Sequence, residues 1–309
     1  MGNYMDRRTF LGSALSAAAA AAVAGTMGGV PRAASAETAA KPPVCVFSKH
    51  LQFLDYPSLA KTCREIGVDG VDLTVRGGGH VEPGRVDRDL PAAVAALRAE
   101  GLEVPMITTS LNDGADPDAR PILEAASKLG IRYCRVGGLK YDASGEILPQ
   151  LAAAAEQLGR LAEVAAEFGI SLGYHNHSGM LNIGAPVWDL HRIFEQVASP
   201  HLGSNLDLGH ALVEGAFGDW QITLRLISRH VKMMAVKDFV WEKNRPRWVK
   251  LGEGILPGVE MLKIMRGADF AGPISMHFEY RVASNEVMFE EMRQASVVLR
   301  GWLRAAGYA

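Results

Sequence analysis

Short apolar runs alternate along most of the chain with longer segments in which apolar residues recur every three or four positions. The short runs predict β-strands, and the longer segments predict amphipathic helices. We expect strands near residues 44–49, 69–75, 102–109, 131–137, 170–176, 202–207, 231–237 and 272–280, and helices near residues 56–66, 88–100, 117–129, 146–168, 185–198, 218–229, 257–267 and 284–305. Eight strand–helix pairs predict a single-domain (β/α)8 barrel, the TIM barrel form of the α/β class.

The junctions between helices and strands support the barrel. Four predicted helices end in a glycine that an apolar residue follows directly, at Gly67, Gly101, Gly130 and Gly169. Glycine favours the left-handed backbone that ends many helices. The main alternative is a doubly wound open sheet, which usually carries a glycine-rich phosphate loop after its first strand. Residues 47–51 contain no glycine, so the sequence favours the barrel.

The amino-terminal segment differs from this pattern and is typical of an export signal. Arg7 and Arg8 precede Phe10 and Leu11, an alanine-rich apolar run follows, and the segment ends in an Ala-x-Ala cleavage pattern. The alternative is a permanent membrane anchor at residues 12–30, but alanine and glycine favour membrane insertion only weakly. We expect a twin-arginine signal peptide at residues 1–36, a tether at 37–43 and the catalytic barrel at 44–309. The protein would then be periplasmic or extracellular.

The charge of the chain argues against a nucleic-acid partner. The formal net charge is −2, and removal of the signal changes it to −4, because Arg7, Arg8, Arg32 and Asp6 are lost. A mildly acidic protein lacks the basic surface that binds a polyphosphate backbone. We therefore expect a small-molecule substrate and no nucleic acid. Beyond the signal, no apolar run is long enough to span a membrane, so no membrane association is expected after its removal.

The cysteines do not form a disulfide framework. The chain has three, at Cys45, Cys63 and Cys134. An odd and widely spaced set is not the pattern of a disulfide-stabilised domain, even in an exported protein. Twin-arginine substrates cross the membrane folded, so a disulfide-free enzyme carrying a cofactor fits that route.

Ligand-type side chains gather where the predicted strands end. His175, Asp207, Lys237 and Glu279 lie near the ends of strands five, six, seven and eight, on the faces predicted to point inward. Catalytic groups of such barrels come from these ends. Lys237 either contacts the substrate or forms a local ion pair with Asp238. Six of the nine histidines lie at strand ends or in the loops after them: His50, His80, His175, His177, His210 and His277.

A metal ion is one interpretation of these residues. Three inward groups, His175, Asp207 and Glu279, would be expensive to desolvate without a partner. Imidazole and carboxylate together suit Mn²⁺, Fe²⁺, Zn²⁺ or Co²⁺ better than Ca²⁺. In the other interpretation, Asp207 only orients His210, as carboxylates behind metal-binding histidines do.

Further residues are candidates for substrate contacts. Arg135 points inward from the fourth strand and suits a hydroxyl, carboxylate or phosphate group. His80 follows a run of three glycines, on a loop that could cover the barrel mouth. Trp241 and Trp248, after the seventh strand, either stack on a sugar ring or anchor their own loop.

Five short segments together resemble the xylose-isomerase-like TIM barrel superfamily. They are Tyr174-His175-Asn176-His177, Leu206-Asp207-Leu208-Gly209-His210, Val236-Lys237-Asp238-Phe239, Leu251-Gly252-Glu253-Gly254 and His277-Phe278-Glu279. The resemblance covers residues 44–305. This superfamily contains ketose epimerases, aldose–ketose isomerases, dehydratases and abasic-site endonucleases. Members with the Tyr-His-Asn-His segment are also linked to the breakdown of 3-keto-sugars and glycosides.

The resemblance implies one divalent metal. Many relatives hold it with Glu, Asp, His and Glu from strands five to eight. In this sequence those positions are His175, Asp207, Ala235 and Glu279, the last with His277 as an alternative. Alanine cannot bind a metal, so a further histidine would have to complete the set. We expect Mn²⁺, Zn²⁺, Co²⁺ or Fe²⁺ at His175, Asp207, His210 and Glu279, with His177 and His277 as alternative ligands.

The resemblance also implies a reaction. We expect an isomerase or epimerase of an unphosphorylated sugar or keto-sugar, because sugar phosphates are scarce outside the cytoplasm. Glu279 and His175 would carry protons, and His210 and Lys237 would bind substrate oxygens or stabilise an enediolate. The expected substrate contacts are Arg135, His80, His177, His277 and Trp241.

Two alternative functions remain open at this point. One is a lyase or dehydratase that acts on a 3-keto-sugar, a 3-keto-glycoside or a cyclitol. The other is a non-catalytic sugar-binding barrel, which Ala235 favours. Export and acidic charge argue against an abasic-site endonuclease. Barrels of this group are often dimers or tetramers, so we expect a homo-oligomer.

Overall fold

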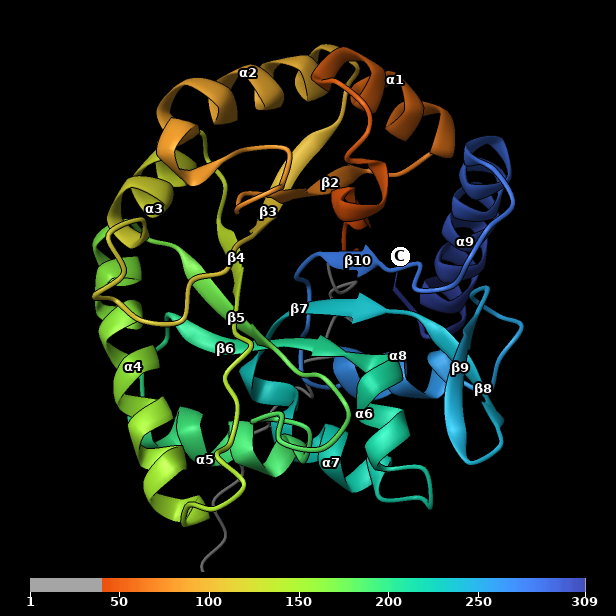
Figure 1. The fold of residues 1–309 in the computed structure, drawn as a ribbon. Helices are drawn as coiled ribbons and strands as arrows, with labels where there is room; N and C mark the ends of the chain where they lie inside the picture. The colour runs from red at the N-terminus through yellow and green to blue at the C-terminus, as the bar shows by residue number, and fades with distance from the viewer. Residues whose placement is uncertain (1–40, 309) are drawn as a thin grey trace, which may run out of the picture. The chain divides into compact units, whose positions relative to one another are not determined.

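Eight short strands pair side by side and close into a barrel in the computed structural model, which describes residues 41–308 (Figure 1). The strands are Val44–Phe47 (β1), Gly70–Thr74 (β2), Glu103–Thr108 (β3), Tyr133–Val136 (β4), Ser171–His175 (β5), Leu202–Asp207 (β6), Val231–Val236 (β7) and Ile274–Met276 (β10). Every neighbouring pair is parallel, and β10 closes the barrel against β1. The predicted (β/α)8 barrel is confirmed, and each of these strands lies within a predicted one.

Helices surround the barrel and connect its strands (Figure 1). They are Tyr56–Ile66 (α1), Val86–Ala99 (α2), Ala119–Lys128 (α3), Ile147–Glu167 (α4), Val187–Val197 (α5), Trp220–Ile227 (α7), Gly258–Arg266 (α8) and Asn285–Ala305 (α9). The four glycines at the predicted helix–strand junctions have φ angles between +65° and +79°. They therefore supply the left-handed residue that ends each helix, as predicted.

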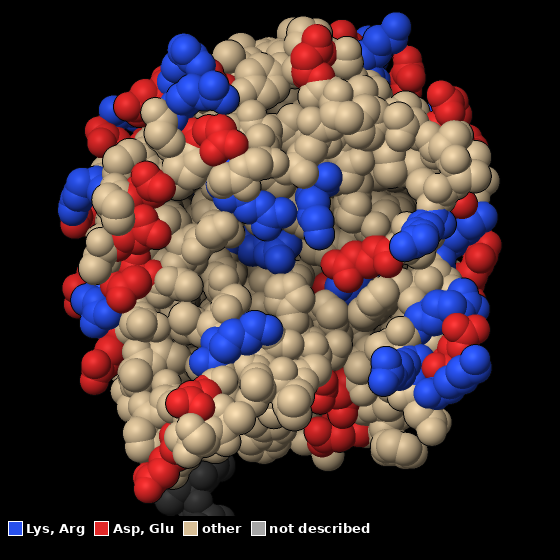
Figure 2. All heavy atoms as spheres, in the orientation of Figure 1, with Lys and Arg blue, Asp and Glu red and all other residues tan. Residues whose placement is uncertain are grey.

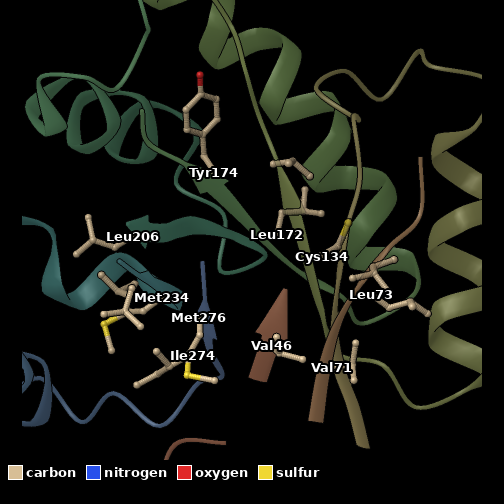
Figure 3. Packing of buried hydrophobic residues seen from close by; sticks show 14 of the residues in the cluster. Val46, Val71, Leu73, Cys134, Leu172, Tyr174, Leu206, Met234, Ile274 and Met276 are labelled. Carbon is tan, nitrogen blue, oxygen red and sulfur yellow. The ribbon is translucent and has the colours of Figure 1, made fainter. Parts of the chain in front are cut away.

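The outer face of the strands forms the hydrophobic core. Leu172 and Tyr174 of β5, Leu206 of β6 and Met234 of β7 point outward and pack against apolar helix residues (Figure 3). Alternate strand residues point to the opposite face, into the barrel. The helices thus cover one face of the sheet, while the inner face can carry polar groups.

Three elements depart from the sequence analysis. Asp238–Glu242 (β8) and Arg245–Val249 (β9) form an antiparallel hairpin outside the barrel. Its turn places Lys243 and Asn244 at φ angles of 49° and 61°, and the absence of a glycine there made the hairpin hard to predict. Leu208–Glu214 (α6) is an additional short helix at the carboxyl end of β6.

The structure describes nothing of residues 1–40, so the predicted signal peptide and most of the predicted tether lie outside the described residues. The three cysteines are free and buried. Within residues 41–308, no helix combines the length and the apolar character that a membrane span requires.

Candidate active site

Four buried side chains converge at the carboxyl ends of neighbouring strands. His175 is the last residue of β5, Asp207 is the last of β6, and Lys237 and His277 directly follow β7 and β10. Asp207 and Ser275 both lie beside Ala235 in the strand register, which brings these ends together. The sequence places the four residues far apart, and the closed barrel makes them neighbours.

Lys237 occupies the centre of this group. Its Nζ lies 3.0 Å from Oε2 of Glu279, 3.3 Å from Oδ2 of Asp207 and 2.7 Å from Nε2 of His210. The same ammonium group stands over the ring of Trp248, 4.3 Å from the ring centroid. Lys237 is only 2% exposed, so these partners replace the water that its charge would otherwise hold.

The ammonium group of Lys237 determines the protonation states of His210 and Glu279. Because it can only donate, Nε2 of His210 accepts, and Nδ1 of His210 carries the proton that it donates to Oγ of Ser178 over 2.8 Å. Burial, and then the charge of Lys237, lowers the pKa of His210 to about 3. Burial alone would raise the pKa of Glu279, but Lys237 outweighs it and holds this pKa below its usual value. Glu279 is therefore an ionised carboxylate at neutral pH.

A second arrangement suits a metal ion. Nε2 of His175 and Nδ1 of His277 lie 3.7 and 4.0 Å from Oδ2 of Asp207, and one ligand-type atom from each of the three residues lies within 4.8 Å of the other two. None of the atoms Nε2, Nδ1 and Oδ2 makes a hydrogen bond to a described residue, although all are buried. Burial, followed by the charge of Arg135, lowers the pKa of both imidazoles well below the usual value. Oδ1 of Asp207 accepts a hydrogen bond from the backbone amide of His210, which leaves Oδ2 free to bind a ligand. Neutral imidazoles and a carboxylate oxygen that accepts no hydrogen bond fit a divalent transition metal.

A third group lies nearer the barrel mouth. Ring nitrogens of His175, His177 and His210 also lie within 4.8 Å of one another. Burial and the neighbouring His210 lower the pKa of His177 to about 4. The predicted metal set is therefore divided in this structure: Asp207 belongs to one group, His210 to the other, and His175 to both. Glu279 belongs to neither and pairs with Lys237.

Comparison with known protein families matches residues 60–305 to the model of the xylose isomerase-like TIM barrel. The chain belongs to this family. The matched residues include all four strand ends that form the site. A search of the curated proteins found no match.

Solved structures with the same fold include enzymes that act on sugars. D-psicose 3-epimerase from Clostridium cellulolyticum H10, solved with D-tagatose, is 14% identical, with a TM-score of 0.66 over 84% of this chain and 99% of its own. The 3-keto-D-glucoside 4-epimerase of E. coli is 14% identical, with a TM-score of 0.64 over 84% and 100%. A xylose isomerase-like barrel from Mycobacterium smegmatis in complex with magnesium is 16% identical, with a TM-score of 0.64 over 84% and 97%.

Asp238, the acidic residue of the Lys-Asp segment, has a structural role. Its carboxylate oxygens accept hydrogen bonds of 3.0 Å from the backbone amides of Gly252, Gly254 and Leu256. Asp238 thereby fixes the loop of Leu251-Gly252-Glu253-Gly254 against the strand end. The sequence suggested a local ion pair between Lys237 and Asp238. This prediction is wrong, because Lys237 pairs with Asp207 and Glu279 instead.

The other predicted substrate contacts lie in different surroundings. Arg135 points into the barrel beside Phe47. His80 lies on the loop after β2, with Nδ1 3.4 Å from Oγ1 of Thr74. Trp241 is 44% exposed on β8, and its ring packs against Phe239. Trp248 on β9, rather than Trp241, faces His210 and Lys237.

Two polar residues of the site escaped sequence reasoning. Asn176 positions Asp207, because its side chain bonds both the backbone amide and the carbonyl of that residue, at 2.7 and 3.2 Å. Asp72 lies inside the barrel and accepts hydrogen bonds from Thr108 and Ser275. An aspartate within the apolar second strand was a signal for an inward polar residue, whereas nothing in the sequence indicated the pairing of Asn176 with β6.

Proposed function

We propose that this chain is a divalent-metal-dependent isomerase or epimerase that acts on an unphosphorylated sugar or keto-sugar. The observation that carries the proposal is the group of unbonded ligand atoms on His175, Asp207 and His277 beside the ion pair of Lys237 and Glu279. Membership of the xylose isomerase-like family supports it. The sugar epimerases that share this fold, and the relative solved with magnesium, point to the same chemistry.

His175, Asp207 and His277 would hold the metal, with His177 and His210 close by. When bound, a divalent metal supplies a Lewis acid that polarises the carbonyl and hydroxyl oxygens of a sugar. Ala235 stands where many relatives are expected to have a histidine ligand. In this chain His277, on the neighbouring strand end, would supply the imidazole instead.

The residues around the metal group would move the proton. Glu279 is ionised and its side chain is 31% exposed, so its carboxylate can reach a bound substrate. It would take the proton from the carbon next to the carbonyl, and the electron pair of that bond would move toward the carbonyl oxygen. Lys237 would donate a hydrogen bond to this oxygen as its negative charge develops. Return of a proton to the opposite face of the same carbon gives an epimer. Return of a proton to the former carbonyl carbon gives an isomer, as the hydroxyl on the carbon that lost its proton gives up its own proton and becomes the new carbonyl.

Solvent exchange and metal content test the proposal together. The purified protein is incubated in D₂O with a panel of sugars and keto-sugars, and deuterium at the carbon next to the carbonyl is measured by NMR. We expect exchange without loss of water, and one transition metal per chain that is lost in His175→Ala and Asp207→Asn. His201→Ala is the matched control, because His201 lies at the opposite end of the strands, with Nδ1 2.9 Å from the carbonyl oxygen of Ile170.

The same experiment separates the alternatives. Elimination of water or of an aglycone after exchange would make the protein a lyase or dehydratase. Sugar binding with neither exchange nor bound metal would leave a non-catalytic binding barrel. Either result would overturn the proposed isomerase.

We also propose that the protein is exported by the twin-arginine route to the periplasm or beyond. The paired arginines, the alanine-rich run and the Ala-x-Ala pattern of residues 1–36 support this. The full chain should be recovered outside the cytoplasm with Glu37 at its new amino terminus. Replacing both Arg7 and Arg8 by lysine should retain the uncleaved chain in the cytoplasm, whereas Arg32→Lys should not. Equal export of all three proteins would contradict the proposal.

A further inference from the structure

Two guanidinium groups converge on one aromatic ring inside the barrel mouth. Cζ of Arg135 on β4 lies 5.2 Å from the centroid of the Phe47 ring, and Cζ of Arg76, which follows β2, lies 5.7 Å from it. Figure 2 shows basic side chains gathered in the hollow at the centre of this face, with one acidic patch beside them. The two positive charges repel each other, and a nearby anion would offset this repulsion.

Arg135 makes no hydrogen bond with its side chain to any described residue. It is 9% exposed, and its Nη1 is buried without a partner. Burial lowers its pKa to about 10, and the charge of Arg76 contributes to this lowering. A guanidinium group has five N–H donors, and leaving them unbonded in a buried place is unfavourable. The side chain is therefore held ready for an acceptor that the described residues do not provide.

The acidic residues nearby are already engaged. Asp72 accepts hydrogen bonds from Oγ1 of Thr108 at 2.7 Å and from Oγ of Ser275 at 2.8 Å, one on each carboxylate oxygen. Burial raises its pKa, and its charge offsets only part of the effect of burial on Arg135. Asp207 and Glu279 both pair with Lys237. No described carboxylate thus forms a salt bridge with either arginine.

The two arginines adjoin the candidate metal group. The imidazole of His277 stacks on the ring of Phe47, with 4.5 Å between the ring centroids and 23° between the planes. Phe47 therefore contacts the reacting region and the arginines together. An anion bound by the arginines would belong to the same small molecule that reaches His277.

We propose that Arg76 and Arg135 form a subsite for an anionic group of the substrate, a carboxylate, so that the substrate is a sugar acid rather than a neutral sugar. The planar guanidinium fork of Arg135 matches the geometry of a carboxylate, which accepts two parallel hydrogen bonds. A phosphate group offers the same charge and acceptors, and the test below distinguishes the two. This inference deepens the proposed function and rests on it.

Binding measurements test the subsite independently of turnover. Calorimetry of the purified protein, with and without added Mn²⁺, compares a hexuronate, the corresponding neutral hexose and its 6-phosphate. We expect the hexuronate to bind about 10- to 100-fold more tightly than the hexose, as a charge-assisted bidentate contact provides. Tighter binding of the hexose phosphate than of the hexuronate would overturn the carboxylate assignment. Equal binding of all three would overturn the subsite itself.

Substitutions test whether the two arginines cause the preference for the hexuronate over the neutral hexose. In Arg135→Met and Arg76→Met, the hexuronate should bind no more tightly than the neutral hexose, while hexose binding changes little. Arg135→Lys keeps the charge without the fork and should retain only part of the preference. Arg132→Met is the matched control, because Arg132 is exposed near the opposite end of β4 and should leave the preference intact. If Arg135→Met does not fold, the half-buried Arg76 still provides the decisive variant.

The experiments distinguish failure of the proposed isomerase from failure of the proposed anion subsite. A protein that prefers the hexuronate but shows no proton exchange keeps the anion subsite and loses the isomerase. A protein that exchanges protons on neutral sugars and does not distinguish the hexuronate keeps the isomerase and loses the subsite.

Discussion

In β6 and its neighbours, apolar residues on the outer face alternate with polar and charged residues on the inner face. On the outer face, Leu206 is fully buried in the core beside Met234. On the inner face, the very next residue, Asp207, is equally buried but has an unbonded carboxylate oxygen and a cation 3.3 Å away. Burial is complete on both faces, so it does not distinguish them. The outer face stabilises the fold by removing apolar surface from water, whereas the inner face holds charges that favour a ligand.

The largest expected effect comes from the inner face. Asp207→Asn removes the negative charge that would bind the metal and that pairs with Lys237. We expect the loss of bound metal and a decrease in kcat/KM of at least about a thousandfold, since a metal contributes several kcal/mol to such a reaction. Metal analysis and steady-state kinetics measure both. Asp87→Asn, on the exposed side of α2, is the control, and a metal-loaded, active Asp207→Asn protein would contradict the assignment.

The next effect concerns the cation between the carboxylates. Lys237→Met removes the donor expected to stabilise the developing oxyanion, so we expect kcat to fall about a hundredfold. Lys237 also keeps the pKa of Glu279 low, and its loss should raise that pKa. Because Glu279 must be ionised to take a proton, the acidic limb of the pH–rate profile should move to higher pH. An unmoved limb would mean that Glu279 is not the base.

The outer face should respond in the opposite way. Leu206→Ala leaves a cavity between the sheet and the helices, which should reduce the free energy of unfolding by about 2 to 5 kcal/mol. Denaturant unfolding measures this change. Metal content and kcat should stay near those of the parent protein, because the site lies across the strand. A variant that keeps its stability but loses its metal would show that the two faces are not separable.

The same contrast explains what the sequence could reveal. The alternation of short apolar runs with amphipathic segments, and the glycines at four junctions, predicted the barrel, because these patterns are local and recur along the chain. It also predicted that His175 and Asp207 point inward. The partners of the inner residues were harder to predict, because they depend on where side chains from four strands meet. Lys237 beside Glu279, and Asn176 bonded to Asp207, are contacts between segments far apart in the chain, and no period in the sequence marks them.

The smallest predicted effect lies at the barrel mouth, where His50 connects β1 to the loop after β10. Its Nε2 accepts a hydrogen bond from the backbone amide of Phe278 over 3.1 Å, which requires a neutral ring. Burial, and then Lys49, lowers the pKa of His50 from 6.5 to about 4. The folded state thus favours the neutral form, so this stabilisation is complete above pH 6.5 and decreases as the pH falls toward 4.

His50→Gln isolates this contribution, because an amide oxygen can still accept from Phe278 but does not titrate. Between pH 6.5 and 4, the parent protein should lose about 1 to 2 kcal/mol more stability than the variant, as the pKa difference implies after allowance for partial solvent screening. Urea unfolding across this range measures the difference between the two proteins. Parallel curves would mean that the pKa of His50 does not change on folding, and that water reaches this side chain at the mouth of the barrel.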